Sequence, residues 1–186
     1  MKRFWSLLLI MAFLNLSAQD KKWSAEVYYP LSIGKAFGSS NQGIIGTSFS
    51  YRFSELGKAH LGGSVNATWF GTTFIEDSDP IQESDFRDFF LQAKAFYDTP
   101  VTDDEKLRFL GGLGWAYQRA RSPGFITDEG EVKGNEANTG PLLSAGLAYT
   151  ILRRWFLAAK TDFLFLFGDS VSRTVGILKI GIGFRF

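Results

Sequence analysis

The chain has 186 residues, a formal net charge of +1 and no cysteine. The near-neutral charge gives no electrostatic reason for nucleic-acid binding, and the lack of cysteine excludes a disulfide framework and thiolate metal sites. Aromatic residues make up 16% of the chain, and Gly contributes 20 residues. That combination is more typical of many strands joined by tight turns than of a helical bundle.

The N-terminus has the features of a secretory signal peptide. It is basic at Lys2 and Arg3, residues 4–16 are almost wholly apolar, and Ala18 ends a small-residue cleavage motif. The apolar run is shorter than the ~20 residues that a membrane-spanning helix needs, which argues against a transmembrane anchor. We therefore predict export, with residues 1–18 as signal peptide and residues 19–186 as one domain.

Beyond the signal segment, bulky apolar residues alternate with small or polar ones at the two-residue period of β-strands. The pattern predicts eight strands, near residues 23–33, 43–53, 59–70, 88–98, 106–118, 143–151, 155–167 and 174–186. Pro30 weakens the first strand locally or marks a bulge, because it cannot donate a ladder hydrogen bond. Helix competes with strand over residues 86–97, where Phe86, Phe89 and Phe90 also fit a 3.6-residue period.

The connections between these strands alternate in length. Short turns are expected at residues 54–58, 99–105 and 153–154, and mostly longer loops at the other ends, including 35–42, 76–85 and 119–139. Within the last loop, residues 124–133 predict a small hairpin. Short turns on one rim and long loops on the other are typical of transmembrane β-barrels.

The aromatic residues fall at two heights along the predicted strands. One group collects at the rim of the short turns: Trp23, Tyr51, Phe53, Tyr97, Phe109, Trp155, Phe184 and Phe186. The other collects at the opposite rim: Trp69, Phe89, Trp115, Tyr117, Phe165 and Phe167. Two such girdles mark membrane interfaces, whereas the alternative, a soluble barrel or sandwich, would not expose Trp and Phe in belts. We predict an all-β fold, an eight-stranded antiparallel up-and-down transmembrane β-barrel.

The opposite faces of the strands carry small residues and isolated charges. The register points eight charged side chains into the lumen: Glu26, Arg52, Lys94, Arg108, Lys160, Asp162, Lys179 and Arg185. Because bare charges in a narrow interior are costly, we expect Glu26 and Asp162 each to serve several cations and to plug the lumen. In the closing strand, Gly181 and Gly183 should leave room for neighbouring side chains. A selective anion path is the alternative to a plug.

With its strand count, its loop asymmetry and a terminal Gly-Phe-Arg-Phe186, the chain resembles the small outer-membrane barrels typified by outer-membrane proteins A and X, over residues 20–186. The resemblance implies the outer membrane of a Gram-negative bacterium and contact with outer-membrane lipid and lipopolysaccharide. It also implies that the barrel-assembly machinery reads Phe186 as an assembly signal. The junction from Ser17 to Gln19 is also similar to signal peptides of Bacteroidota.

Catalysis is not expected from this chain. The resemblance brings in two enzymatic small barrels, the lipid A deacylase and palmitoyltransferase, which depend on a His paired with Ser near the outer leaflet. The single histidine, His60, lies beside a predicted inner-rim turn instead, with Ser64 four residues on and no carboxylate evidently placed to orient the ring. We predict no catalytic residue, no metal and no cofactor.

The loops supply the remaining candidate sites. Basic residues expected at the outer rim could contact lipopolysaccharide phosphates, for which Arg is well shaped: Lys35, Arg87, Arg119, Arg121 and Arg173. The predicted hairpin could bind a partner protein through Phe125, Asp128, Glu129 and Glu131. We predict a structural or surface-interaction barrel that acts through its loops. The alternatives are an accessory subunit of a larger outer-membrane secretion, assembly or uptake complex, and passage of anions or small apolar solutes.

Overall fold

The computed structural model describes residues 22–34, 42–76, 82–121, 125–127, 130–132, 135–168 and 173–186. The predicted signal peptide, Lys35, Asp128 and Glu129 lie outside these residues, and within 72–76, 82–86, 125–127 and 130–132 the description is limited to the backbone. In this part of the chain, no helix is long and apolar enough to cross a membrane.

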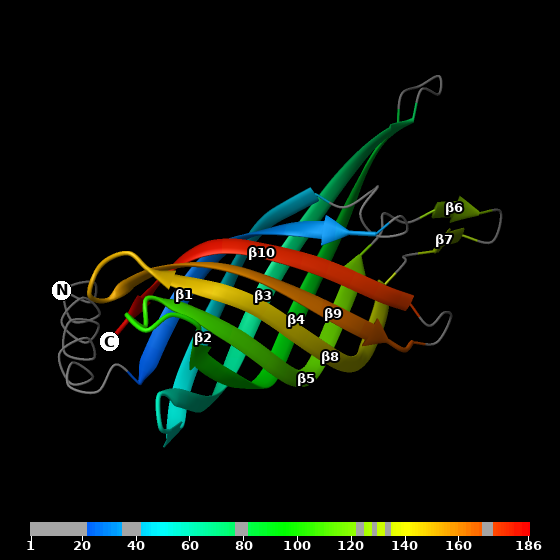
Figure 1. Cartoon of the computed structure of the whole chain (residues 1–186). Coiled ribbons are helices and arrows are strands. Elements are labelled where there is room, and N and C mark those ends of the chain that lie inside the picture. The colour runs from blue at the N-terminus through cyan, green and yellow to red at the C-terminus, as the bar shows by residue number, and fades with distance from the viewer. Residues whose placement is uncertain are drawn as a thin grey trace, which may run out of the picture.

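Eight strands form a closed barrel in which neighbours in the chain are neighbours in the wall (Figure 1). They are β1 (Trp23–Ile33), β2 (Gln42–Leu56), β3 (Ala59–Glu76), β4 (Gln82–Pro100), β5 (Leu107–Arg121), β8 (Asn135–Thr150), β9 (Trp155–Leu166) and β10 (Arg173–Arg185). All pairs are antiparallel, and β10 closes the barrel on β1. The predicted up-and-down eight-stranded barrel is confirmed, and residues 86–97 are strand and not helix.

A separate two-stranded sheet lies between β5 and β8 in the chain. It consists of β6 (Phe125–Thr127) and β7 (Gly130–Val132), with Phe125 paired to Val132 and Thr127 to Gly130. Figure 1 shows this hairpin beyond the end of the barrel opposite to the β4–β5 and β8–β9 turns. The hairpin predicted within residues 124–133 is therefore confirmed at the level of the backbone.

Two of the loops predicted from polarity are largely strand. The β3–β4 ladder continues to Glu76 opposite Gln82, and the β5–β8 ladder continues to Arg121 opposite Asn135. Outside an apolar belt, both faces of a strand can meet water, so hydropathy stops alternating while the backbone ladder goes on. The loops predicted over 76–85 and 119–139 were too long for that reason, since residues 76, 82–85, 119–121 and 135–139 belong to barrel strands.

The short turns all lie at the end of the barrel where β1 begins and β10 ends. Trp23 and Phe186 exchange backbone hydrogen bonds there, at 3.2 and 3.0 Å. The β2–β3 turn needs a left-handed residue and has Gly57, at φ 64°. In the β4–β5 turn the Thr102 hydroxyl donates to Asp104 Oδ1 at 2.6 Å, which lowers the pKa of that exposed carboxyl.

Pro30 leaves β1 intact but ends one of its two ladders. On the β10 side the pairing runs without a break from Ser24 to Ile33, with Pro30 opposite Lys179. On the β2 side the pairing ends at Tyr28 opposite Gly46. Pro30 has no N–H to offer β2, so the strand continues on one partner only.

Over much of its height, the barrel has polar side chains inside and apolar side chains on its outer surface. On β10, Ile180 and Ile182 are 51% and 45% exposed, whereas Lys179, which directly precedes Ile180, is 1% exposed. Large apolar side chains are exposed in the same way along the other barrel strands. A soluble barrel would reverse this arrangement, since water and not lipid would meet its outer surface.

Candidate functional site

The centre of the lumen is built around one carboxylate shared by two lysines. Asp162 on β9 is fully buried and lies 3.1 Å from Lys94 Nζ on β4 and 2.6 Å from Lys179 Nζ on β10. Lys94 also donates to Ser144 Oγ at 2.7 Å, and Lys179 donates to Gln92 Oε1 at 2.5 Å. The network joins four strands, β4, β8, β9 and β10, across the lumen.

Tyr28 fills the adjoining part of the lumen from β1. Its hydroxyl is hydrogen-bonded to Thr68 Oγ1 at 2.7 Å, and Lys179 Nζ lies 4.9 Å from the centre of its ring. A Cβ on Gly46 of β2 would come within 2.0 Å of that ring, so the ring needs a glycine at this position. Lys179 is thus held between Asp162, Gln92 and the aromatic face.

Glu26 pairs with a single cation, Lys160, within the described part of the chain. The other carboxylate oxygen of Glu26, Oε1, has no hydrogen-bond partner there. The expectation that Glu26 serves several cations is therefore wrong, whereas Asp162 does bridge two. The cations expected to share Glu26 find another partner, closer to the rim of the short turns.

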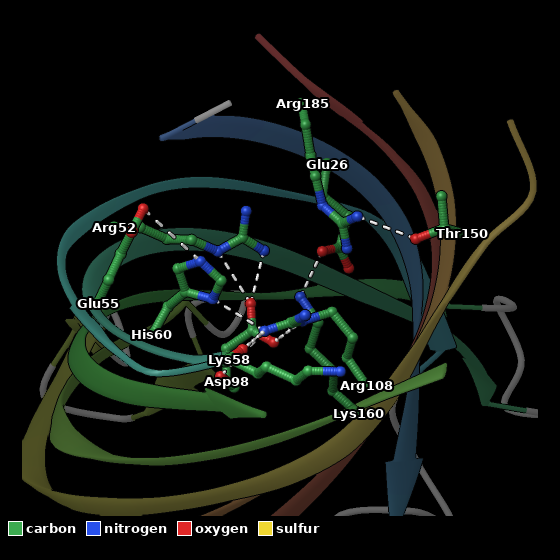
Figure 2. Close-up of polar contacts among 10 residues, drawn as sticks. All are labelled: Glu26, Arg52, Glu55, Lys58, His60, Asp98, Arg108, Thr150, Lys160 and Arg185. Atoms are coloured by element: carbon green, nitrogen blue, oxygen red, sulfur yellow. Dashed lines mark hydrogen bonds and ion pairs between the residues drawn. The ribbon is translucent and has the colours of Figure 1, made fainter. Parts of the chain in front are cut away.

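That partner is Asp98 on β4, which is not among the predicted lumen charges. Arg52 Nη2 lies 2.6 Å from Asp98 Oδ2, and Arg108 Nε bonds to Asp98 Oδ1 (Figure 2). Arg108 Nη2 also bonds His60 Nδ1 at 2.8 Å and donates to the Lys58 carbonyl at 2.9 Å. The sequence did contain a signal for Asp98. The predicted lumen charges were six cations and only two carboxylates, an imbalance that calls for a further inward carboxylate.

Arg185, at the end of β10, lies in the mouth of the barrel beside the short turns, which we call the inner mouth. Its Nη1 donates to Thr150 Oγ1 at 2.9 Å, and its guanidinium carbon lies 4.7 Å from the centre of the Phe156 ring. A Cβ on Gly183 would come within 2.2 Å of that ring, so Gly183 leaves the space that the sequence analysis expected. No described carboxylate forms an ion pair with Arg185.

His60 and Ser64 do not form a base–nucleophile pair. Ser64 Oγ is buried without a hydrogen-bond partner among the described residues, while His60 binds Arg108 and lies 4.0 Å from Glu55 Oε1 through Nε2. The histidine is thereby part of the inner-mouth charge cluster. Over the described residues, no group of three His, Asp or Glu side chains is placed to hold a metal ion.

Between the charge network and the end of the barrel that bears the β6–β7 hairpin, an apolar layer fills the lumen. Its members are nearly or fully buried: Phe70, Phe90, Ala116, Leu142, Leu164, Leu166, Val175 and Ile177. Phe70 and Phe90 meet edge to face, with ring centres 5.7 Å apart. Beyond the layer, Gln118 donates to Asp88 at 3.0 Å and accepts from Asn138 at 3.3 Å. Charged side chains are therefore only part of the plug, because large apolar residues close its outer half.

This apolar layer could hardly be predicted from the sequence. Inward apolar residues such as Val175 and Ile177 look the same in sequence as residues that face outward, unless the strand register is known to the residue. The inward faces were read as small and charged from their inner halves, where Gly181, Gly183 and Arg185 lie.

The predicted aromatic girdle residues have their side chains on the outer surface. Near the short turns, Trp23 meets Tyr51 at 4.3 Å between ring centres, and Trp155 meets Phe184 at 5.0 Å. Further along the wall, Trp69 and Phe89 are 5.1 Å apart. Of the remaining predicted positions, Trp115 and Phe165 are 55% and 43% exposed. Trp115 Nε1 donates to Thr139 Oγ1 at 2.5 Å.

Three arginines form an exposed strip on β4 and β5, at the end of the barrel that bears the β6–β7 hairpin. Arg87 is directly opposite Arg121, and Arg119 is directly opposite Phe89 of the aromatic pair. Arg173 differs from them, since its Nη2 lies 2.9 Å from Glu136 Oε2. Of the predicted lipopolysaccharide contacts, Arg87, Arg119 and Arg121 are thus gathered on one surface just beyond the aromatic residues.

No family model and no curated protein matches this sequence. The structure, however, is similar to the attachment invasion locus protein Ail of Yersinia pestis, with a TM-score of 0.57 and 16% identity over 88% of this chain and 97% of that one. It is similar to Neisserial surface protein A with a TM-score of 0.57 and 17% identity, over 88% and 96% of the two chains.

A third similar structure is the outer membrane protein OprG of Pseudomonas aeruginosa, with a TM-score of 0.56 and 14% identity over 88% and 95%. The chain has the fold of the small eight-stranded outer-membrane barrels. In such barrels the short turns are periplasmic and the longer connections are extracellular. The mouth lined by Asp98 and Arg185 is then the inner one, and the arginine strip belongs to the outer rim.

Proposed function

We propose that this protein is a closed, non-enzymatic outer-membrane barrel that holds anionic surface glycolipid at its outer rim. The apolar exterior supports insertion in a bilayer, because exposed residues such as Ile180 and Ile182 gain by facing lipid while Lys179 and Asp162 stay inside. The apolar layer at Phe70 and Phe90 supports a lumen that passes no solute. What remains available to other molecules is the rim and the hairpins beyond it.

The observation that carries the proposal is the arginine strip. Arg87 and Arg121 face each other directly across β4 and β5, which concentrates positive charge on one part of the outer surface. Arg119 lies on the same outward face, next to Phe89. A guanidinium can bind a phosphate through two parallel hydrogen bonds, and lipid A carries phosphates at this depth of the membrane.

A related protein supplies an independent parallel. Ail of Yersinia pestis, in a structure with 21% identity and a TM-score of 0.56 to this chain, was crystallised with the heparin analogue sucrose octasulfate. That ligand is a dense polyanion. We infer that the strip on β4 and β5 here takes the phosphates of a lipid A headgroup.

The proposal is tested by binding of lipid A to the purified barrel in a zwitterionic detergent. Replacing Arg87, Arg119 and Arg121 together by Gln should weaken binding of phosphorylated lipid A by roughly tenfold or more, and should flatten its salt dependence. Dephosphorylated lipid A should bind wild type and variant alike. The control replaces Lys58, in the β2–β3 turn, and Arg154, in the β8–β9 turn, by Gln, which removes two cations at the opposite end of the barrel. Equal binding of phosphorylated lipid A to wild type and to the triple variant would reject the proposal.

The β6–β7 hairpin supports a second candidate function, docking of a partner protein. It forms its own two-stranded sheet and is no part of the barrel wall, so it can be removed without breaking the ladder from β5 to β8. We propose that this hairpin, which includes Phe125 and Glu131, joins the barrel to a larger outer-membrane assembly.

Deletion of residues 124–133 tests that function. The deleted protein should keep its heat-dependent gel mobility, which reports a folded barrel, and should lose proteins that co-purify with the wild type in mild detergent. The control shortens the β3–β4 hairpin by a similar length. The same set of co-purifying proteins before and after deletion would remove this candidate.

A further inference from the structure

The inner mouth of the barrel carries more positive charge than its carboxylates balance. An open cleft of about 290 Å³ lies there, lined by six cations: Lys22, Arg52, Lys106, Arg108, Arg153 and Arg185. Its three lining carboxylates are already engaged with neighbours on the rim. Asp104 lies 3.6 Å from Lys106, Glu105 lies 3.1 Å from Lys58, and Glu55 lies 4.0 Å from His60. The cleft thus presents an excess of guanidinium groups to anything entering from the periplasmic side.

Arg185 shows where the missing negative charge belongs. Its side chain is almost entirely enclosed, with 9% of the residue exposed, and its Nε has no hydrogen-bond partner among the described residues. Arg52 and Arg108 share Asp98, whereas Arg185 has only the Thr150 hydroxyl and the face of Phe156. Figure 2 shows its guanidinium directed into the mouth that Arg52 and Arg108 also line. A buried guanidinium with an unused donor is an unusual cost unless an acceptor comes to it.

The space behind this mouth is closed. A cavity of about 40 Å³, which Arg52 and Arg185 also line, continues inward to Glu26 and Lys160. Further out, the apolar layer around Phe90 and Leu164 fills the lumen. An anion that enters the mouth therefore meets a blind end, so the geometry fits a binding site and not a conduction path.

We propose that the inner mouth binds a phosphate-type oxyanion through Arg185 and Arg52, with Arg153 at the entrance. Guanidinium forks match the oxygens of a phosphate, and these three arginines line the cleft from β2, β10 and the β8–β9 turn, so that they can contact one tetrahedral group from several sides. Free phosphate and the headgroup of an anionic phospholipid in the inner leaflet share this chemistry. The site is independent of the outer-rim proposal, because the two lie at opposite ends of the barrel.

Titration calorimetry in a zwitterionic detergent tests the site with inorganic phosphate as the probe, against sodium chloride at constant ionic strength. Wild type should bind phosphate saturably at one site. Arg185→Gln should weaken that binding roughly ten- to hundredfold, as loss of a charge-assisted hydrogen bond does, and Arg185→Lys should fall in between. Arg121→Gln, at the outer rim, should bind phosphate as the wild type does.

A second arm separates the two sources of the phosphate group. Barrels are placed in nanodiscs of phosphatidylcholine with added phosphatidylglycerol, in a buffer without phosphate, and the ³¹P signal of each lipid is recorded. Broadening of the phosphatidylglycerol signal that is lost in Arg185→Gln identifies a lipid headgroup as the ligand. Phosphate binding in detergent without such broadening identifies a free anion.

Two results would overturn the proposal: phosphate or lipid binding that is equal in wild type and Arg185→Gln, or no binding in either arm. If Arg185→Gln does not refold, as judged by heat-dependent gel mobility, Thr150→Ala takes its place. That substitution removes the hydroxyl that orients Arg185, together with a methyl group, so it should weaken phosphate binding measurably while leaving all the charges present. Unchanged binding in a folded Thr150→Ala variant together with Arg185→Lys would count against the site equally.

Discussion

Asp162→Asn should be among the most destabilising single substitutions in this barrel. Asp162 is fully buried and is the carboxylate shared by Lys94, at 3.1 Å, and Lys179, at 2.6 Å. The amide keeps the volume but removes the charge, which leaves two enclosed ammonium groups facing each other. Lys94 would retain Ser144 and Lys179 would retain Gln92, and both of these acceptors are neutral.

The magnitude follows from the cost of breaking a buried ion pair, about 3–5 kcal/mol when one partner is removed. The upper part of that range is expected, since two lysines lose their partner at once. With a urea dependence of ~2 kcal/mol per M, the unfolding midpoint should move down by roughly 2 M at an unchanged slope. Asp103→Asn, in the exposed β4–β5 turn, is the matched control and should change the free energy of unfolding by less than about 0.5 kcal/mol.

The assay is reversible urea unfolding of the barrel in lipid vesicles, followed by tryptophan fluorescence. A double-mutant cycle with Lys179→Met isolates the pair. The double variant leaves one buried lysine without a carboxylate instead of two, so it should be more stable than the sum of the single changes implies, by ~1–3 kcal/mol. Additive effects, or a loss below about 1 kcal/mol for Asp162→Asn, would refute the reasoning.

Three further changes test other parts of the interior by the same unfolding measurement. Gly183→Ala places a Cβ 2.2 Å from the Phe156 ring and should cost ~1–3 kcal/mol by overpacking. Its control is Gly63→Ala, whose added Cβ has its nearest atom 4.0 Å away and should be close to neutral. Equal effects of the two changes would contradict the contact with Phe156. Asp98→Asn leaves two arginines without their carboxylate and should cost about 2–4 kcal/mol, with no loss indicating that solvent already screens them. Phe90→Ala should cost ~3–5 kcal/mol by opening the apolar layer, and a loss under 1 kcal/mol would show that the layer is loosely packed.

Most of the barrel wall could be predicted from the sequence, because a two-residue alternation of apolar and polar side chains is sensitive to strand register. Shifting β10 by one residue would bury Ile180 and Ile182 inside and put Lys179 into lipid, and only one register avoids that. Over residues 86–97, strand was preferred to helix from the context of the neighbouring strands. In the barrel, β4 lies between β3 and β5 and pairs with both. Strand ends were less well predicted, because β3 and β4 keep pairing after their hydropathy stops alternating.

The interior partners could not be assigned from the sequence. The alternation of side chains shows which of them point inward. It does not show which side chains from different strands lie at the same height in the lumen, because that depends on strand tilt and stagger. Asp98 was thus left out, although it is the partner of both Arg52 and Arg108. The apolar layer was missed for the related reason that Phe90 and Ile177 meet only when strands distant in sequence are brought together.

Conductance across a planar lipid bilayer tests the closed lumen most directly. The purified wild-type barrel should insert without giving a steady current, because the apolar layer around Phe90 and Leu164 lies in series with the Asp162 network and neither leaves a continuous aqueous path. A stable, ohmic current through the wild type, reduced by changes at Arg52 or Lys179, would contradict the closed barrel.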